Sequence, residues 1–322
     1  VVDICTRMQN SSQKHAPLVT VIIAFAIVYI VWGSTYFFIQ ASLRDFPPFI
    51  LGAFRFLASG VLLLAWCAFK KYKLFIRKQI ITSIIVGNLL LFVGNGAIIW
   101  AETILPSSFV AVLVSASPLW FVLFDTQNHK LNFGSKNIII GVITGFVGVI
   151  LLFSDKMFSN FSSGTQTLQI VPLLVIILGS ITWTIGSLYS KYNATGNTMV
   201  GAAWQMIFAA ISFIIVACFN GEVHHFDISQ VHTRGWLSVI YLITMGSLAG
   251  YSAYIWLLEV RPATQVSTNS YVNPVVAVLL GVFFGGEFIN GLQIGALAVI
   301  LLSVFIINFN KYKNKLSAKS SG

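Results

Sequence analysis

The sequence predicts an all-α integral membrane protein with ten transmembrane helices, arranged as two inverted-topology repeats of five. Three observations predict this fold class: charged residues are scarce, they are regularly spaced, and the two halves of the chain resemble each other. Of the 322 residues, 57% are hydrophobic and 9% are Asp, Glu, Lys or Arg, whereas a soluble domain carries about 25% charged residues. This composition excludes an ordinary soluble enzyme, a disordered chain and a secreted disulfide scaffold.

The few charged residues divide the chain into segments long enough to cross a bilayer. A helix needs about 20 apolar residues to span the hydrocarbon core. A segment at 46–69 contains a single charge, Arg55, and nine segments of 18 to 34 residues contain none: 15–43, 79–101, 103–124, 137–154, 157–190, 192–221, 235–258, 262–286 and 288–310. We therefore expect ten spans, the first of which is too long for a signal peptide.

The distribution of basic residues predicts that both termini face the cytoplasm. In this orientation fifteen Lys and Arg residues fall in cytoplasmic segments and three, Arg44, Lys156 and Arg234, fall outside, as the positive-inside rule requires. The net charge of +10 is thereby explained. Because the basic residues are scattered over short segments and do not form one patch, no nucleic-acid partner is expected.

An internal repeat relates the two halves of the chain. A shift of 156 residues places WAETILPSSFVAVLVSASPLWFVL over WLLEVRPATQVSTNSYVNPVVAVL. Six residues then coincide: Trp100, Pro106, Val110, Pro118, Val122 and Leu123 with Trp256, Pro262, Val266, Pro274, Val278 and Leu279. Because each half has an odd number of spans, equivalent spans cross the membrane in opposite senses, as in many secondary transporters. We expect one repeat over 17–154, a second over 168–310, and cytoplasmic tails at 1–16 and 311–322.

Two of the repeated prolines, Pro118 and Pro274, are predicted to kink the fourth and ninth spans. Each lies about 18 Å along its helix at 1.5 Å per residue, near the middle of a core about 30 Å thick. A proline frees the carbonyl four residues earlier, and such groups lie against protein or a water-filled cavity. The prolines mark either moving helices beside a substrate cavity or packing kinks without a ligand.

Motifs in consecutive order give the chain a resemblance to a known family. They are WGSTYFFIQ, PPFILGAFRFLASGVLLL, GNGAIIWAE and SSFVAVLVSASPLW in the first half and YVNPVVAVLLGVFFGGE in the second. Each set resembles an EamA domain, and the chain resembles the ten-helix drug/metabolite transporter (DMT) superfamily, in particular its bacterial YedA/PecM-like branch. The resemblance implies two inverted repeats, a central cavity and multi-pass insertion in the bacterial cytoplasmic (inner) membrane. It also implies efflux of small metabolites, often amino acids or related compounds, and identifies no substrate.

Arg55 is the one charged residue expected within a span. A charge there costs about 2.5–3.5 kcal/mol on insertion scales, so it is usually paired or functional. In one interpretation Arg55 faces the cavity and attracts a substrate carboxylate. In the other it extends outward to the interface or forms an ion pair with Glu102, at the end of the third span.

Acidic residues are expected only in loops and at the ends of spans. Proton-coupled exporters of cations need a carboxylate at mid-depth, so the sequence favours a neutral, zwitterionic or anionic substrate. Facilitated diffusion without a coupling ion remains open. So does titration of Asp125 or Glu102 from a water-filled vestibule.

Polar and aromatic residues of both repeats are the candidate substrate-binding residues. They are Trp32, Ser34, Tyr36, Arg55, Asn95, Trp100, Ser115 and Ser117 in the first half, and Trp183, Ser187, Tyr251, Tyr254, Asn269, Tyr271 and Asn273 in the second. Aromatic walls with a few hydrogen-bonding groups suit a small amphipathic ligand. The alternatives are anchoring of Trp and Tyr at the lipid interface and hydrogen bonds of Asn and Ser between helices.

No motif indicates a cofactor, a metal site or catalysis. The chain lacks GxxxxGK[ST], HExxH, CxxC and GxSxG patterns. His224, His225 and His232 share one external loop, but adjacent side chains rarely point the same way, so no metal site is expected. Small residues spaced for close helix contact, such as Gly141 and Gly145, allow either a monomer or a weak homodimer.

Together these features predict a secondary transporter whose partners are a small-molecule substrate and the lipid bilayer. We expect it to export an amino acid or a similar metabolite by alternating access around a cavity near the midplane. Three rival functions remain: a proton-coupled drug efflux pump, a membrane-embedded enzyme and a passive channel.

Overall fold

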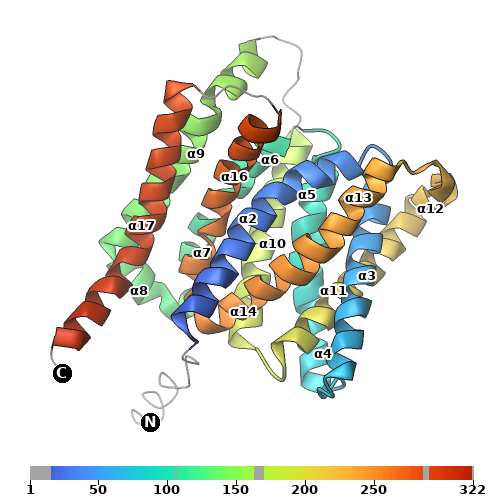
Figure 1. The fold of residues 1–322 in the computed structure, drawn as a ribbon, viewed down its shortest axis with the longest axis horizontal. Coiled ribbons are helices and arrows are strands. Elements are labelled where there is room, and N and C mark those ends of the chain that lie inside the picture. The colour runs from blue at the N-terminus through green and yellow to red at the C-terminus, as the bar shows by residue number, and fades with distance from the viewer. Residues whose placement is uncertain (1–15, 106, 163–169, 286–289, 321–322) are drawn as a thin grey trace.

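The computed structural model describes residues 16–105, 107–162, 170–285 and 290–320, and all regular secondary structure in these ranges is helical (Figure 1). Six helical stretches there are long and apolar enough to cross a membrane: Leu18–Ser42, Pro48–Phe69, Arg77–Ala101, Ile170–Tyr192, Thr198–Phe219 and Thr233–Val260. Val110–Phe124 and Thr126–Gly134, bent by 61°, form a seventh candidate. The predicted all-α membrane protein is confirmed, whereas the count of ten spans stays a prediction. Pro106 lies outside the described residues.

The first half contains two continuous helices, then two interrupted ones, and then a continuous last helix. Its helices are α2 (Leu18–Ser42), α3 (Pro48–Phe69), α4 (Arg77–Val86), η1 (Gly87–Asn95), α5 (Gly96–Ala101), α6 (Ser107–Val114), α7 (Ser117–Phe124), η2 (Thr126–Asn128), α8 (His129–Gly134) and α9 (Lys136–Ser162). Pro48 occupies the first turn of α3, where its missing N–H has no helical partner to lose. The segments α4, η1 and α5 form one span whose middle part, η1, is a π-helix.

The second half repeats this order of continuous and interrupted helices. Its helices are α10 (Ile170–Tyr192), α11 (Thr198–Phe219), α12 (Glu222–His225), η3 (Ile228–Gln230), α13 (Thr233–Tyr241), η4 (Leu242–Tyr251), α14 (Ser252–Val260), α15 (Ala263–Val266), α16 (Asn269–Gly285) and α17 (Gly291–Ser320). Asn197 caps α11 by accepting hydrogen bonds from the N–H groups of Met199 and Val200. As in the first half, a π-helix, η4, lies in the middle of the third long helix.

The two repeated prolines occupy different positions in their helices. Pro118 lies in the first turn of α7, directly after the break that separates α6 from α7. Pro274 lies inside α16, while the corresponding break, at Ser267 and Thr268, comes earlier in the chain. Both helices are therefore interrupted near the repeated proline, although only the first interruption is adjacent to it.

The last helix of each half packs against the other. Figure 1 shows α9 and α17 side by side at one edge of the bundle. Gly145 permits this approach, since a Cβ atom there would lie 2.6 Å from Ser303 Oγ. Gly141 has the same role towards Ile307. The small-residue face of α9 is thus filled within the chain.

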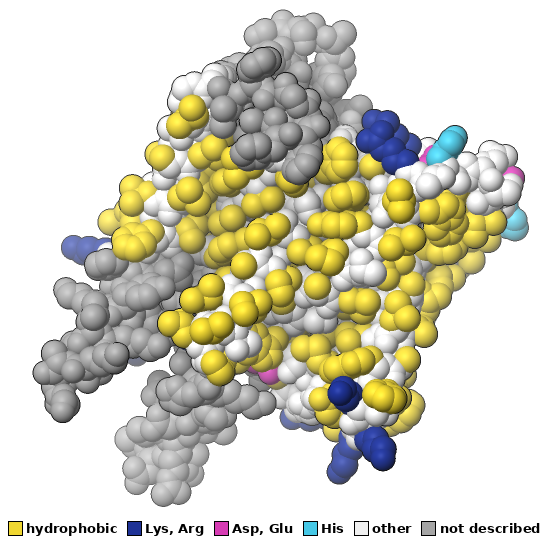
Figure 2. All heavy atoms as spheres, in the orientation of Figure 1, with side chains coloured by type: hydrophobic (Ala, Val, Ile, Leu, Met, Phe, Trp, Pro, Cys, Tyr) yellow, Lys and Arg dark blue, Asp and Glu magenta, His cyan; other side chains and the backbone are white. Residues whose placement is uncertain are grey.

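The remaining helices form the main hydrophobic core. Phe213 of α11 stacks on Phe56 of α3 with ring centroids 5.8 Å apart, and Gly52 leaves room for the same ring. Hydrophobic side chains also cover the outer face of the bundle, while Lys and Arg gather towards the helix ends (Figure 2). An apolar outer surface of this kind suits contact with lipid.

Candidate functional site

A small cavity lies between helices of the two halves. It encloses about 60 Å³, which is room for a few water molecules at about 10–15 Å³ each. Its wall includes residues of α2, α3, η1, α5, α6 and α7 from the first half and of α10, η4 and α16 from the second. In α2 the lining residues run from Trp32 to Ile39, so the cavity lies beside the C-terminal half of that helix.

The cavity brings together nine of the fifteen candidate residues. They are Trp32, Tyr36, Arg55, Asn95, Ser117, Trp183, Tyr251, Asn269 and Asn273. Six others are not in its wall: Ser34, Trp100, Ser115, Ser187, Tyr254 and Tyr271. Several lining residues were not among the candidates, including Ile39, Ser180 and Gly246.

Arg55 is the only Lys or Arg side chain among the residues of the cavity wall. Its side chain is 3% exposed. Nε donates to Ser247 Oγ at 2.9 Å, and Nη1 donates to Asn95 Oδ1 at 3.3 Å. A guanidinium has five N–H groups, so three of them have no hydrogen-bond partner among the described residues. A cationic group with unused donors is therefore exposed to the cavity.

Two neighbouring residues fix the position of this guanidinium. Its Cζ lies 4.9 Å from the ring centroid of Phe56, a cation–π contact. A Cβ atom at position 246 would lie 3.0 Å from Nη2 of Arg55. Gly246 therefore gives the guanidinium the space it occupies.

Glu102 lies close enough to interact electrostatically with Arg55 and Tyr36. No ion pair of 4 Å or less joins it to Arg55 in the part of the chain that the structure describes, where the ion pair within that distance is between His232 and Asp45. Glu102 is 6% exposed, and neither carboxylate oxygen has a hydrogen-bond partner among the described residues. The predicted pairing of Arg55 with Glu102 is thus present only as a longer-range interaction.

Two tryptophans, Trp32 and Trp183, form one wall of the cavity, and Tyr254 packs behind them. The ring centroids of Trp32 and Trp183 are 5.4 Å apart, and Tyr254 lies 4.8 Å from Trp32. Trp183 Nε1 donates to Tyr254 Oη at 2.9 Å, and Ser187 Oγ lies 2.7 Å from the same hydroxyl. Tyr254 and Ser187 therefore position Trp183 from outside the cavity. Gly250 makes room for Trp32, since a Cβ atom there would lie 2.6 Å from Trp32 Nε1.

Hydrogen-bond acceptors lie in the part of the wall formed by α10 and α16. Asn273 Oδ1 and Ser180 Oγ are buried and have no hydrogen-bond partner among the described residues. Both residues line the cavity. Unpaired buried polar atoms are rare in native proteins, so these two atoms are available to water or a ligand.

Three of the candidates, Ser34, Tyr251 and Tyr271, make hydrogen bonds between helices. Ser34 Oγ lies 2.6 Å from Tyr241 Oη, and Tyr251 Oη donates to Gln205 Oε1 at 2.7 Å. Tyr271 Oη donates to the Val142 carbonyl of α9 at 2.7 Å. Ser115 Oγ donates to the Val112 carbonyl, and Trp100 packs in a small apolar cluster with Tyr36, which also lines the cavity.

A polar network lies at the end of the bundle where α2 begins, which the sequence predicts to be cytoplasmic. Tyr192 of α10 donates to Asp125, and Asn128 Nδ2 donates to Tyr192 Oη at 2.8 Å and to Asp125 Oδ2 at 3.1 Å. Lys191 Nζ donates to the carbonyls of Leu258 and Arg261 at 2.5 and 2.6 Å. The network joins the end of α7 in the first half to the end of α10 in the second.

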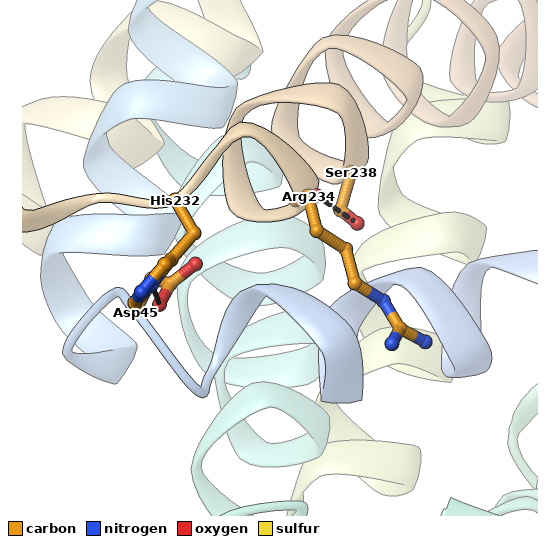
Figure 3. Close-up of polar contacts among 4 residues, drawn as sticks. All are labelled: Asp45, His232, Arg234 and Ser238. Carbon is orange, nitrogen blue, oxygen red and sulfur yellow. Dashed lines mark hydrogen bonds and ion pairs between the residues drawn. The ribbon is translucent and has the colours of Figure 1, made fainter.

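Different contacts join the halves at the opposite end. His232 Nδ1 lies 2.8 Å from Asp45 Oδ1, while the nearby Arg234 side chain points away from that pair (Figure 3). Glu222 Oε2 accepts hydrogen bonds from the N–H groups of Phe49 and Ile50, both at 3.0 Å, and so caps α3. The described residues contain no group of three or more His, Cys, Asp or Glu able to hold a metal ion.

Comparisons with known proteins agree with this architecture. The model of the EamA-like transporter family matches residues 19–154 and 170–309. The uncharacterized inner membrane transporter YedA of Escherichia coli (strain K12) is 34% identical over 296 residues, with 90% of each chain covered. The uncharacterized transporter YoaV of Bacillus subtilis (strain 168) is 22% identical, with 93% of this chain and 100% of that protein covered. A solved crystal structure has the same fold, with a TM-score of 0.71, 19% identity, and coverage of 90% of this chain and 97% of that one.

Proposed function

The chain belongs to the EamA-like transporter family, and on this premise we propose that it exports a small metabolite bearing a carboxylate across the bacterial inner membrane. The proposed substrate is an anionic or zwitterionic compound of the size of an amino acid. Its family makes the protein a multi-pass transporter and not an enzyme. The substrate, the direction and the mechanism are the proposed parts.

The main support for a substrate with a carboxylate is Arg55. A buried guanidinium with unused N–H groups matches the two oxygens of a carboxylate, which it binds through parallel hydrogen bonds. Ser247 and Asn95 hold the group by two of its donors and leave the others without an acceptor among the described residues. A cationic substrate would be repelled by this charge.

The rest of the wall supports a substrate with both apolar and polar parts. Trp32, Trp183 and Tyr251 supply apolar surface, and Asn273 Oδ1 and Ser180 Oγ supply free acceptors. An ammonium or hydroxyl group at the far end of the substrate would satisfy these acceptors. Aromatic walls with a few fixed polar groups are typical of small-molecule sites.

We further propose ten spans in two inverted repeats that alternate access to the cavity. Three features of the described chain support this: both halves line the cavity, both contain a π-helical segment in the third long helix, and both contain a broken helix with a repeated proline. The cavity, about 60 Å³ in volume, is bordered by both halves. In the proposed mechanism, movement of the halves relative to each other opens this cavity to one side of the membrane at a time.

Counterflow in liposomes tests the proposal. Purified protein is reconstituted with a panel of unlabelled amino acids and carboxylates inside, and uptake of the labelled compound is followed. We expect saturable counterflow of at least one carboxylate and none of its decarboxylated amine. Arg55→Gln should abolish this flux, while Arg234→Gln, at an exposed external position, should not. Counterflow of amines alone, or flux that does not saturate, would contradict the proposal.

A further inference from the structure

We infer that Glu102 is a proton-binding residue linked to the Arg55 site, so that a proton and a substrate carboxylate bind cooperatively. This inference rests on the proposed function, because it takes Arg55 as the carboxylate anchor. It goes further by assigning a role to an acidic residue outside the cavity wall. Its basis is the burial of Glu102, whose two carboxylate oxygens are unpaired among the described residues, together with its longer-range electrostatic interaction with Arg55, which lines the cavity.

Glu102 is buried next to an apolar cluster. It follows directly on Ala101, which packs with Val110, Ala111 and Ile176 in one buried cluster. Both carboxylate oxygens are buried without a hydrogen-bond partner among the described residues. Burial of an ionised carboxylate that lacks hydrogen bonds is strongly unfavourable, whereas a neutral carboxyl is tolerated in such a place.

The ionisable groups that act on Glu102 come from two helices. Arg55 of α3 acts on it electrostatically, and Tyr36 of α2 is affected by its charge. Helix α6 carries no ionisable side chain, and those of α10, Tyr189, Lys191 and Tyr192, lie at the far end of that helix. The guanidinium of Arg55 is therefore the one cation that favours an ionised Glu102 among the described neighbours.

This arrangement makes the proton and the carboxylate depend on each other. When Glu102 is ionised, it neutralises part of the field of Arg55 and repels an incoming anion. When Glu102 takes a proton from solvent, one O–H bond forms, no other bond changes, and Arg55 keeps its full charge for the substrate. Linkage is reciprocal, so a bound carboxylate in turn makes proton uptake by Glu102 more favourable.

Infrared titration of the purified protein tests the proton-binding part without a ligand. The difference spectrum between wild type and Glu102→Gln should show a band of a protonated carboxyl group that disappears as pH is raised. Arg55→Gln should move the midpoint of this change to higher pH, because the cation that favours ionisation is gone. A band that is absent throughout pH 4–9, or that persists throughout, would overturn the inference.

Calorimetric titration with 3-phenylpropionate tests the linkage. Its carboxylate suits Arg55 and its ring suits the aromatic wall. In wild type we expect proton uptake on binding, seen as a dependence of the measured heat on the buffer, and an affinity that falls by up to about tenfold per pH unit above the midpoint. In Glu102→Gln the affinity should be independent of pH. The matched control Asp227→Asn, in an exposed loop, should behave as wild type.

The outcomes separate the two proposals. If wild type binds 3-phenylpropionate without proton uptake, the linkage is overturned and the carboxylate site is retained. If wild type binds neither 3-phenylpropionate nor any carboxylate of the panel, the proposed function fails and the linkage fails with it.

Discussion

The guanidinium of Arg55 and the hydroxyl of Ser247 are joined by a hydrogen bond of 2.9 Å across 192 positions of the sequence. Arg55 lies on a regular helix, α3, and Ser247 lies on the π-helical segment η4. Segments of this type frequently occur at functional sites. The bond attaches the only Lys or Arg of the cavity wall to the opposite half of the chain.

Loss of this bond should weaken substrate binding. Ser247→Ala removes the acceptor of Arg55 Nε and leaves a buried charged donor unpaired, which costs about 1.5–3 kcal/mol. We expect KM in counterflow to rise by about tenfold or more, with a smaller change in maximal flux. Ser252→Ala is the matched control, since its buried hydroxyl has no partner among the described residues. An equal rise in KM for both variants would show that the effect is not specific to Arg55.

Removal of the Tyr254 hydroxyl should affect the aromatic wall. Tyr254→Phe deprives Trp183 Nε1 and Ser187 Oγ of their common partner, and we expect a loss of about 1–3 kcal/mol of stability. Because Trp183 lines the cavity, KM should also rise. Tyr271→Phe loses a buried hydrogen bond outside the cavity wall and should lower thermal stability with no change in KM. A KM for Tyr254→Phe equal to that of wild type would contradict a role for this wall in binding.

Loosening the network at the end where α2 begins should open the cavity towards that side. Tyr192→Phe removes the hydroxyl that joins Asp125 and Asn128 to α10. A cysteine replacing Ser117 in the cavity wall, in a chain whose native cysteines are replaced, should then react faster with a water-soluble maleimide applied from that side.

The control for this measurement lies at the same end of the bundle. Thr198→Val breaks a hydrogen bond to Glu259 of 2.6 Å, but both residues belong to the second half. It should leave the labelling rate unchanged. Equal acceleration by both variants would indicate general loosening and would contradict a gating role for Tyr192.

Glu222 should make the stability of the protein depend on pH. Burial raises the pKa of this carboxyl group, and the hydrogen bonds from Ile50 and Phe49 oppose that shift to a smaller extent. A group whose pKa is higher in the folded state binds protons more tightly there. Its contribution is therefore largest below the unfolded pKa, about 4.3, and is lost as pH rises through the folded pKa. Thermal unfolding across pH 4–8 should show a steeper decline for wild type than for Glu222→Gln.

Asp227 is a control for Glu222, because its pKa is shifted in the opposite direction. Hydrogen bonds from Ser229 lower the pKa of this exposed carboxyl group. Its contribution to stability is therefore present above the unfolded pKa and is lost as pH falls. Asp227→Asn should change the acid side of the unfolding profile. If Glu222→Gln and Asp227→Asn changed the pH dependence of stability in the same direction, the stated causes of the two pKa shifts would be contradicted.

The contact between α9 and α17 should tolerate no added methyl group at Gly145. A Cβ atom there would lie 2.6 Å from Ser303 Oγ and 2.7 Å from the Tyr271 ring, and overpacking of this kind costs about 1–3 kcal/mol. Gly145→Ala should lower the midpoint of thermal unfolding, whereas Gly295→Ala, with nothing within 4 Å, should not. A change of oligomeric state with unaltered stability would show instead that this face meets a second copy.

The sequence predicted the helical membrane fold because the scarcity and spacing of charges depend on composition alone. It also singled out Arg55, since one charge within an apolar segment is conspicuous without any structure. Nine of its fifteen candidate residues line one cavity. The repeated prolines indicated interrupted helices, although Pro274 lies inside α16 and the break comes before it.

The sequence did not predict Ser247 as a partner of Arg55, and no pattern distinguishes this serine from other small polar residues in apolar segments. The direction of the Ser247 side chain depends on the π-helical segment η4. A π-helix has more residues per turn than an α-helix, so its side chains point in directions that the α-helical period does not predict. Tyr271 was expected in the cavity and instead contacts α9, where Gly145 leaves room for its ring.

The sequence by itself determined that the chain lies in a membrane, where its long apolar segments begin and end, and which charge is out of place. The tertiary structure alone decided which face of each helix meets the cavity, that Ser247 holds Arg55, and that Glu102 is left unpaired among the described residues. The physical reason is that a membrane helix is apolar both towards lipid and towards its neighbours. Hydrophobic periodicity, which gives the rotation of a helix in a soluble protein, therefore carries little information here, and close packing of small residues sets the rotation instead.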